Sequence, residues 1–417
     1  MTLLADLLST MLDRRSRTAG QGRASSRPIE RLMADLLGSA GEMSELALAQ
    51  DILDHYTSLD DAGKLDFLGH LAHDMAIDPE AVRLAVDAYE QAPSKQSYRA
   101  FMQAAEPPRQ ELIRRLNRVP GATGALVRMR ADLLRLAGDD PELAALDLDF
   151  RHLLASWFNR GFLVLRPISW ETPAHILDKI TAYEAVHAIQ SWDDLRRRLQ
   201  PRDRRCFAFF HPAMPDDPLI FVEVALTKGI PGSVQALLAE DRKTLAPEVC
   251  DTAVFYSISN CQAGLASVSF GNSLIKQVVA DLSADLPGLA RFVTLSPIPL
   301  LTRWAEAEGI PMPDDPEARR ALAAHYLLNA KGRGAAPHDP VARFHLGNGA
   351  LVHAVHADAD ASPNGQAQSG GVMVNYLYDR AQVAANHEDY QTKQKINASS
   401  EVTSLARTGA NAVMAER

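Results

Sequence analysis

The segment from Phe255 to Trp304 constrains the fold more than any other part of this sequence. It reads as a strand, a glycine-punctuated loop, an amphipathic helix and a second strand, followed by the run Ser296-Pro297-Ile298-Pro299. A loop that leads into a helix presents free backbone N–H groups at the helix N-terminus, where anions bind. The segment therefore predicts a phosphate-bearing ligand at the loop and a rigidly held hydroxyl at the tip of the second strand.

Two regions of different pattern flank this segment. Residues 28–160 show helical spacing of apolar residues and almost no strand signal, and their short loops indicate an antiparallel bundle. From Gly161 onward β-like runs alternate with helices, which is typical of an α+β domain. The predicted strands are 162–168, 206–210, 218–226, 252–260, 291–296, 350–357 and 370–379.

These patterns predict three parts. Residues 1–27 form a flexible N-terminal tail, residues 28–160 a helical bundle, and residues 161–417 a mixed domain with a mobile or loosely docked C-terminal tail. Residues 358–370 read as a polar loop, because they are rich in Asp, Ser, Asn, Gln and Gly.

Composition excludes several classes of protein. The formal net charge of -9 argues against nonspecific nucleic-acid binding. No apolar run reaches the ~18 residues that a membrane span needs. Cys206, Cys250 and Cys261 form no CxxC pair, which fits a reducing compartment. Residues 14–27 are rich in Arg and Ser like a transit peptide, but Asp6 and Asp13 interrupt the stretch before them, so we expect a disordered tail on a cytoplasmic protein.

Several common catalytic signatures are missing from the sequence. It contains no GxGxxG, no GxxxxGK[ST], no GxSxG and no HExxH. His70 and His73 lie on one helical face, whereas His353 and His356 point to opposite faces of a strand, and no acidic cluster joins either pair. We therefore expect no metal and no cofactor.

The glycine-containing loop at residues 262–272 has two interpretations. Gly264 and Gly271 permit backbone conformations closed to other residues, the helix N-terminus after them favours a pyrophosphate, and Lys276 adds positive charge nearby. Alternatively, the glycines only turn the chain between a strand and a helix. The loop by itself does not decide between them.

Ser296 and His345 are the candidate reacting groups. Pro297 biases Ser296 toward an extended backbone, which fixes the direction of its side chain and suits catalysis as well as packing. His345 precedes a Gly-Asn-Gly turn and suits either a proton carrier or a structural hydrogen-bonding group.

Six segments, in order along the chain, resemble the malonyl-CoA decarboxylase family. They are FHPAMPDDPLIFVEVALT (210–227), FYSISNCQAGL (255–265), FGNSLIKQVV (270–279), TLSPIP (294–299), RFHLGNGA (343–350) and GVMVNYLY (371–378). The resemblance implies a helical oligomerisation domain followed by a catalytic domain with the fold of the GCN5-related N-acetyltransferases. It implies conversion of malonyl-CoA to acetyl-CoA and CO2 without a cofactor, and self-association into a homo-oligomer such as a tetramer.

The resemblance also implies roles for particular residues. By motif match, Ser296 and His345 fall on the family's catalytic pair. The residues that we expect to bind the substrate are Ala266, Ser267, Val268, Ser269, Phe270, Gly271, Asn272, Lys276 and Tyr378. Animal members carry a glutamate where this chain has Ser269, so a third, acidic catalytic group is not implied here. Backbone N–H groups near 266–272 are expected to stabilise charge on the thioester oxygen.

Two other functions stay open on the sequence alone. The same fold serves acetyltransferases, which pass an acetyl group to an amine. A catalytically silent protein that binds acyl-CoA, with the helical half as its output module, is the second alternative. Release of CO2 from malonyl-CoA without an acceptor would distinguish a decarboxylase from both.

Overall fold

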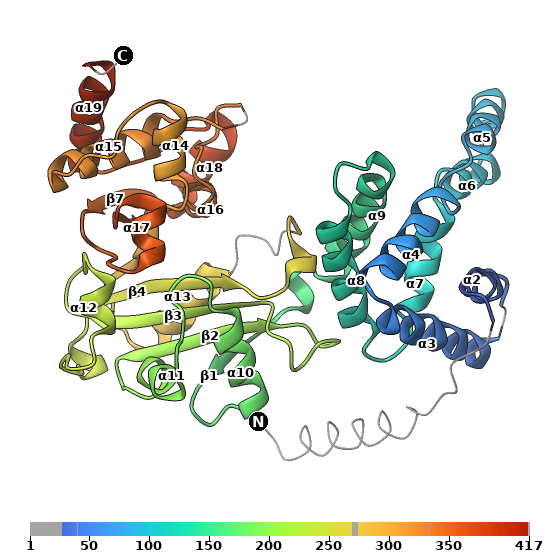
Figure 1. The fold of residues 1–417 in the computed structure, drawn as a ribbon, viewed down its shortest axis with the longest axis horizontal. Helices are drawn as coiled ribbons and strands as arrows, with labels where there is room; N and C mark the ends of the chain where they lie inside the picture. The colour runs from blue at the N-terminus through green and yellow to red at the C-terminus, as the bar shows by residue number, and fades with distance from the viewer. Residues whose placement is uncertain (1–26, 40, 269–273, 333, 416–417) are drawn as a thin grey trace. The chain divides into compact units, whose positions relative to one another are not determined.

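The computed structural model describes residues 27–39, 41–268, 274–332 and 334–415. The expected tail at 1–27 lies, apart from its last residue, outside these ranges. The chain divides into two compact units (Figure 1). The first contains Met1–Leu163 with His211–Pro215 and Gln262–Phe270, and the second contains Val164–Phe210, Asp216–Cys261 and Gly271–Arg417.

The first unit is a bundle of helices, and the sequence shows where several of them begin. The side chains of Asp60, Asp78 and Asp140 accept hydrogen bonds from the first-turn N–H groups of the helices that follow them. The helices are α2 (Ile29–Gly38), α3 (Glu42–Ser58), α4 (Asp61–His73), α5 (Pro79–Gln91), α6 (Lys95–Ala104), α7 (Pro108–Leu116), α8 (Ala122–Leu136) and α9 (Pro141–Trp157), followed by the 3-10 turn η1 (Arg160–Phe162).

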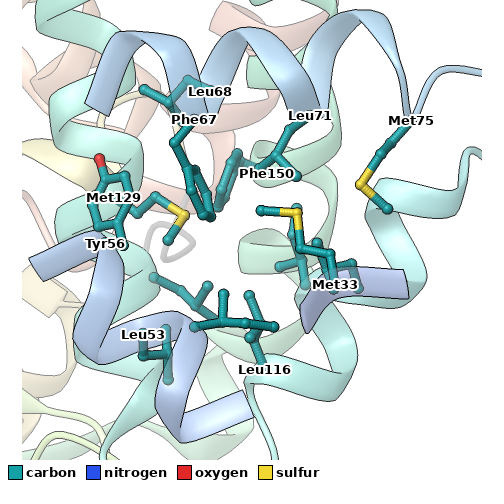
Figure 2. Close-up of a cluster of buried hydrophobic side chains, with 14 of the residues drawn as sticks. Met33, Leu53, Tyr56, Phe67, Leu68, Leu71, Met75, Leu116, Met129 and Phe150 are labelled. Atoms are coloured by element: carbon teal, nitrogen blue, oxygen red, sulfur yellow. The ribbon is translucent and has the colours of Figure 1, made fainter. Parts of the chain in front are cut away.

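One buried apolar cluster holds most of these helices together. Side chains from α2, α3, α4, α7, α8 and α9 point toward a common centre, where Met33, Phe67, Met129 and Phe150 are at most 4% exposed (Figure 2). Burial of such side chains contributes roughly 1.5–3 kcal/mol each. Helices α5 and α6 differ, because none of their residues is buried.

The second unit is built on one mixed sheet. Its strands are β1 (Val164–Ile168), β2 (Arg204–Phe210), β3 (Ile220–Thr227), β4 (Thr252–Asn260), β5 (Arg291–Thr294), β6 (Ser296–Pro297), β7 (Leu351–His356) and β8 (Met373–Leu377). The order is β1-β2-β3-β4-β5-β8-β6, with β7 paired to β8. All pairs are antiparallel except β4 and β5, which are parallel and joined through α13 (Leu274–Asp285). The expected fold class, a helical bundle followed by a mixed α/β domain, is confirmed.

The second unit also contains helices between and after these strands. They are α10 (Ala174–Tyr183), α11 (Trp192–Leu199), α12 (Val234–Leu238), α14 (Leu301–Ala307), α15 (Pro316–Asn329), α16 (Pro340–Gly347), α17 (Pro363–Ser369), α18 (Val383–Lys393) and α19 (Ser400–Ala415). The 3-10 turns η2 (Pro247–Val249) and η3 (Ala263–Leu265) lie in connections. No helix in the described residues is both long and apolar enough to cross a bilayer.

Two predicted segments differ from the structure. The predicted polar loop at 358–370 is wrong in part, because Ser362 caps a helix there and Pro363 occupies its first turn. The C-terminal segment, which the sequence led us to expect as mobile, contains α18 and α19. Val402 and Ala406 of α19 are buried. Gly409 allows α19 to approach α15 closely, since a Cβ there would lie 2.2 Å from the carbonyl oxygen of Ala321.

Candidate active site

Ser296 lies in the second unit at a break between two short strands. β5 ends at Thr294, and β6 begins at Ser296, which is paired with Val374 of β8. Pro297 follows in the same strand and keeps the backbone extended. The Ser296 side chain is therefore held at a strand tip, as the sequence predicts, and the residue is only 6% exposed.

His345 is placed by the short helix α16. Asp339 caps this helix by accepting a hydrogen bond from the Ala342 N–H, and Pro340 occupies its first turn. His345 lies in the last turn and is 2% exposed. The sequence contains this Asp-Pro helix start, which the prediction of a histidine before a turn did not use.

The two predicted residues meet. His345 Nε2 lies 3.2 Å from Ser296 Oγ, although 49 positions separate them along the chain. On the other side of the ring, His345 Nδ1 lies 2.8 Å from the hydroxyl of Tyr378. The Tyr376 ring stacks on the imidazole with centroids 4.6 Å apart. Tyr378, which we expected at the substrate, thus contacts the histidine directly.

Burial controls the charge of these groups. It lowers the pKa of His345 to about 3, because the cationic ring would lose its hydration and gains no carboxylate partner in return. Burial also raises the pKa of the Tyr378 hydroxyl. Near neutral pH, His345 and Tyr378 are therefore both uncharged, and they contact each other as neutral hydrogen-bonding groups.

A largely apolar cavity of 280 Å³ opens onto the pair. Its walls include Phe255, Ile258, Leu295 and Phe344. Among the described residues that line it, none is an Asp, Glu, Lys or Arg. An apolar cavity of this kind suits a small acyl group.

The predicted substrate loop belongs to the first unit. Gly264 lies against α8, and a Cβ there would be 1.8 Å from the carbonyl oxygen of Val127, so only glycine fits. Arg130 of the same helix, 1% exposed, donates to the carbonyl oxygens of Gly264 and Ala266 at 2.8 Å each. Ser267 follows with a φ of 61°, in the left-handed region. Strained backbone of this kind clusters at functional sites.

The backbone donors expected in this loop are partly engaged. The N–H groups of Ala266 and Val268 donate to the carbonyls of Ala263 and Leu265, so they form local turns. These two amides therefore do not serve as free donors, contrary to our expectation. Ser269, Phe270, Gly271 and Asn272 lie outside the described residues.

Lys276 is exposed on the first turn of α13. It lines a 220 Å³ cavity together with Ile275, Tyr378 and Arg380. Arg380 was not predicted; its only sequence signal is its place two residues after the tyrosine of the MVNYLY motif. The cavity places two cationic side chains beside the tyrosine that contacts His345.

Two further residues support the pair and were missed. Thr294 Oγ1 accepts the Ser296 hydroxyl at 2.8 Å, and Asn375 Nδ2 donates to the Thr294 carbonyl oxygen at 2.8 Å. Both are fully buried. Thr294 lies in the TLSPIP motif and Asn375 in the GVMVNYLY motif, but their contact crosses strands β5 and β8, which a single sequence does not pair.

The described residues contain no group of three or more metal-binding side chains. His70 instead contacts Asp74, and His73 contacts Glu142. The cysteines are buried and unpaired. Burial raises the pKa of the Cys206 and Cys261 thiols, so neither is a ready nucleophile.

Comparison with known proteins identifies the family. The malonyl-CoA decarboxylase C-terminal domain model matches residues 161–316 and 316–416, and the N-terminal domain model matches residues 76–158. Mitochondrial malonyl-CoA decarboxylase of Anser anser anser is 34% identical, over 82% of this chain and 79% of its own length. The enzyme of Rattus norvegicus is 32% identical, over 85% and 84%.

Solved structures agree with these matches. The malonyl-CoA decarboxylase of Rhodopseudomonas palustris has a TM-score of 0.84 and 47% identity, covering 90% of this chain and 98% of that one. The one of Agrobacterium vitis has a TM-score of 0.86 and 47% identity, covering 91% and 99%. The chain therefore belongs to the malonyl-CoA decarboxylase family, a family of carboxy-lyases.

Proposed function

We propose that this protein converts malonyl-CoA to acetyl-CoA and CO2, with Ser296 and His345 as its catalytic pair. The observation that carries the proposal is the 3.2 Å contact between Ser296 Oγ and His345 Nε2 at the wall of an apolar cavity. The family supports the reaction and the substrate, since its members that match this chain are named for them.

The reaction breaks the bond between the malonyl carboxylate and the α-carbon. The electron pair of that bond moves onto the α-carbon and, by conjugation, onto the thioester oxygen. A proton then forms the new C–H bond of acetyl-CoA. The chain must hold the carboxylate in a dry site, stabilise the enolate and deliver one proton.

The described side chains suit these tasks. The apolar walls favour release of CO2, because they solvate the carboxylate poorly. Ser296 would orient the malonyl carboxylate through its hydroxyl. His345 would protonate the α-carbon through a neutral N–H, since burial keeps the ring uncharged. General-acid catalysis of this kind contributes roughly 100- to 10,000-fold.

The test measures CO2 from malonyl-CoA and purified protein, with no acceptor added. We expect wild type to release CO2 and His345→Ala to lose roughly 100- to 10,000-fold in kcat with a modest change in acetyl-CoA affinity. Ser296→Ala should follow in the same direction. Full activity of both variants would remove the pair from the mechanism. Acetyl transfer to an amine without CO2 release would favour an acetyltransferase, and tight binding without turnover a silent acyl-CoA-binding protein.

We also propose that the protein self-associates through α5 and α6. Leu84 is 62% exposed, Tyr98 52% and Met102 51%, although such side chains normally cover a core. A second copy of the chain would bury this apolar face. Leu84→Asp combined with Met102→Asp should lower the mass measured by light scattering. Leu148→Asp, at another exposed leucine (61%), should not. A double variant with the wild-type mass would contradict this interface.

Finally, we propose that the protein acts in the cytoplasm. The support is that Asp6 and Asp13 interrupt the segment that precedes the Arg- and Ser-rich residues 14–27. Cell fractionation with an internal tag tests the location, and recovery from an organelle in a shortened form would overturn it.

A further inference from the structure

The hydroxyl of Thr294 receives two hydrogen bonds in the buried region beneath the catalytic pair. Ser296 Oγ donates to Thr294 Oγ1 at 2.8 Å, and the backbone N–H of Tyr376 donates to the same oxygen at 3.1 Å. Thr294 itself is 0% exposed. Thr294 Oγ1 therefore accepts from two donors, and one of them is the Ser296 hydroxyl.

Thr294 is also held through its backbone. Asn375 Nδ2 donates to the Thr294 carbonyl oxygen at 2.8 Å, and Asn375 Oδ1 lies 2.5 Å from His356 Nε2. Asn375 is fully buried in β8. The Thr294 backbone is thus anchored from the neighbouring strand, and its side-chain oxygen accepts from Ser296 and Tyr376.

The direction of this bond decides which nitrogen of His345 carries the proton. A serine hydroxyl has one proton, and Ser296 gives it to Thr294. Toward His345 Nε2, 3.2 Å away, Ser296 can therefore only accept, so Nε2 must carry the proton. In a neutral ring Nδ1 is then an acceptor, and it accepts from the Tyr378 hydroxyl at 2.8 Å.

We propose that Thr294 is a positioning residue that sets the polarity of this chain of hydrogen bonds and thereby the Nε2–H tautomer of His345. The inference rests on the proposed function. It places the transferable proton on the nitrogen that contacts Ser296, beside the cavity. With the opposite polarity that nitrogen would be a bare acceptor, unable to protonate a carbanion.

The polarity also supplies a balanced proton transfer. As CO2 leaves, the Nε2–H proton bonds to the α-carbon, and Nδ1 takes the proton of the Tyr378 hydroxyl. The ring stays neutral throughout, while the Tyr378 oxygen becomes a phenolate. Tyr378 also lines the cavity that contains Lys276 and Arg380. After the transfer, Nδ1 returns its proton to the Tyr378 oxygen and Nε2 takes one proton from solvent, which restores the Nε2–H tautomer.

Thr294→Val tests this role, because valine keeps the shape and removes the acceptor. Ser296 is then free to donate to His345 Nε2, which moves the ring proton to Nδ1. We expect kcat to fall by about 100-fold, the low end for general-acid catalysis. KM for malonyl-CoA should change less than about threefold. Thr294→Ser keeps the acceptor and should restore kcat to within about fivefold of wild type.

A nitrogen-15 spectrum of labelled histidine reads the tautomer directly. The sequence has 13 histidines, so the signals of His345 are identified as those missing from His345→Gln. We expect a protonated Nε2 in wild type and in Thr294→Ser, and a protonated Nδ1 in Thr294→Val. Circular dichroism and acetyl-CoA binding check that each variant is folded.

The outcomes separate this inference from the proposed function. Wild-type kcat in folded Thr294→Val, or an equal loss in Thr294→Ser, overturns the positioning role while leaving the pair intact. A protonated Nδ1 in the wild-type spectrum also overturns it, and this measurement stands even where Thr294→Val does not fold. Full activity of Ser296→Ala and His345→Ala instead overturns the proposed function itself.

Discussion

Replacing His345 by glutamine should reduce the loss of unfolding free energy that the protein suffers as the pH falls below 7. Burial lowers the pKa of His345 to about 3 in the folded protein, against its ordinary value of 6.5 in an unfolded chain. Between these values the unfolded chain binds a proton that the folded protein excludes, so stability falls as pH falls through 6.5. Lowering the pH from 7 to 5 should therefore cost the wild type about 2 kcal/mol through this group alone.

Calorimetry at pH 7 and pH 5 measures this difference. For a unit of this size, 2 kcal/mol corresponds to roughly 4–8 °C in Tm. His345→Gln has no titrating ring, so its Tm should fall by that much less than the wild-type Tm over the same pH step. The test compares the Tm change of wild type with that of His345→Gln, because other groups also titrate in this range. Burial raises the pKa of Asp339 to about 6, and this group stabilises both proteins as the pH falls.

A surface variant provides the control. His152→Gln removes an exposed histidine and serves as the matched control for the loss of a histidine side chain. The reasoning fails if His345→Gln loses as much Tm as wild type between pH 7 and pH 5. That result would mean that the buried ring is already protonated when folded, or that acid opens the site before the unit unfolds.

Three further changes test other parts of the structure. Arg130→Met breaks a buried ion pair and frees two loop carbonyls, so calorimetry should show a loss of roughly 3–5 kcal/mol, while exposed Arg128→Met on the same helix should stay within about 0.5 kcal/mol. Gly409→Ala pushes a methyl group toward the Ala321 carbonyl and should cost roughly 1–3 kcal/mol, and an unchanged Tm would show that α19 moves freely. Lys276→Ala should weaken coenzyme A binding measured by titration calorimetry, with little change in kcat, and wild-type affinity would make this lysine a bystander.

Local signals in the sequence predict much of the fold. The parallel pair β4 and β5 with α13 between them lies where apolar runs and glycines place it. The helices α16 and α17 were missed, although Asp339-Pro340 and Ser362-Pro363 are helix starts of the same kind as Asp78-Pro79, where α5 begins. Both helices are short, and polar or glycine-rich residues within and beside them hide the periodic pattern that marks a longer helix.

The site was predicted less completely, because its parts come from distant strands. Ser296 and His345 were found through motifs, and the structure brings them together. Thr294 and Asn375 required the pairing of β5 with β8, which lie about 80 positions apart and share no local pattern. The proposed tautomer of His345 depends on groups that the pairing of β5 with β8 brings together. A sequence therefore identifies Ser296 and His345 as candidates but does not give the direction of the hydrogen bonds between them.

On the proposed function, the burial of His345 serves two steps of the reaction. A cationic histidine at this cavity would form an ion pair with the malonyl carboxylate and stabilise the substrate more than the transition state, in which that charge is dispersing. The apolar walls and the stacked Tyr376 ring keep the imidazole neutral, so the carboxylate gains no such pair. A neutral imidazole is a weak acid, but the carbanion beside a thioester is a strong base, so the proton still moves downhill once CO2 has left. The same dry cavity that speeds the loss of CO2 therefore also selects a neutral proton donor, and a polar substitution in its wall, such as Phe344→Asn, should slow both steps together.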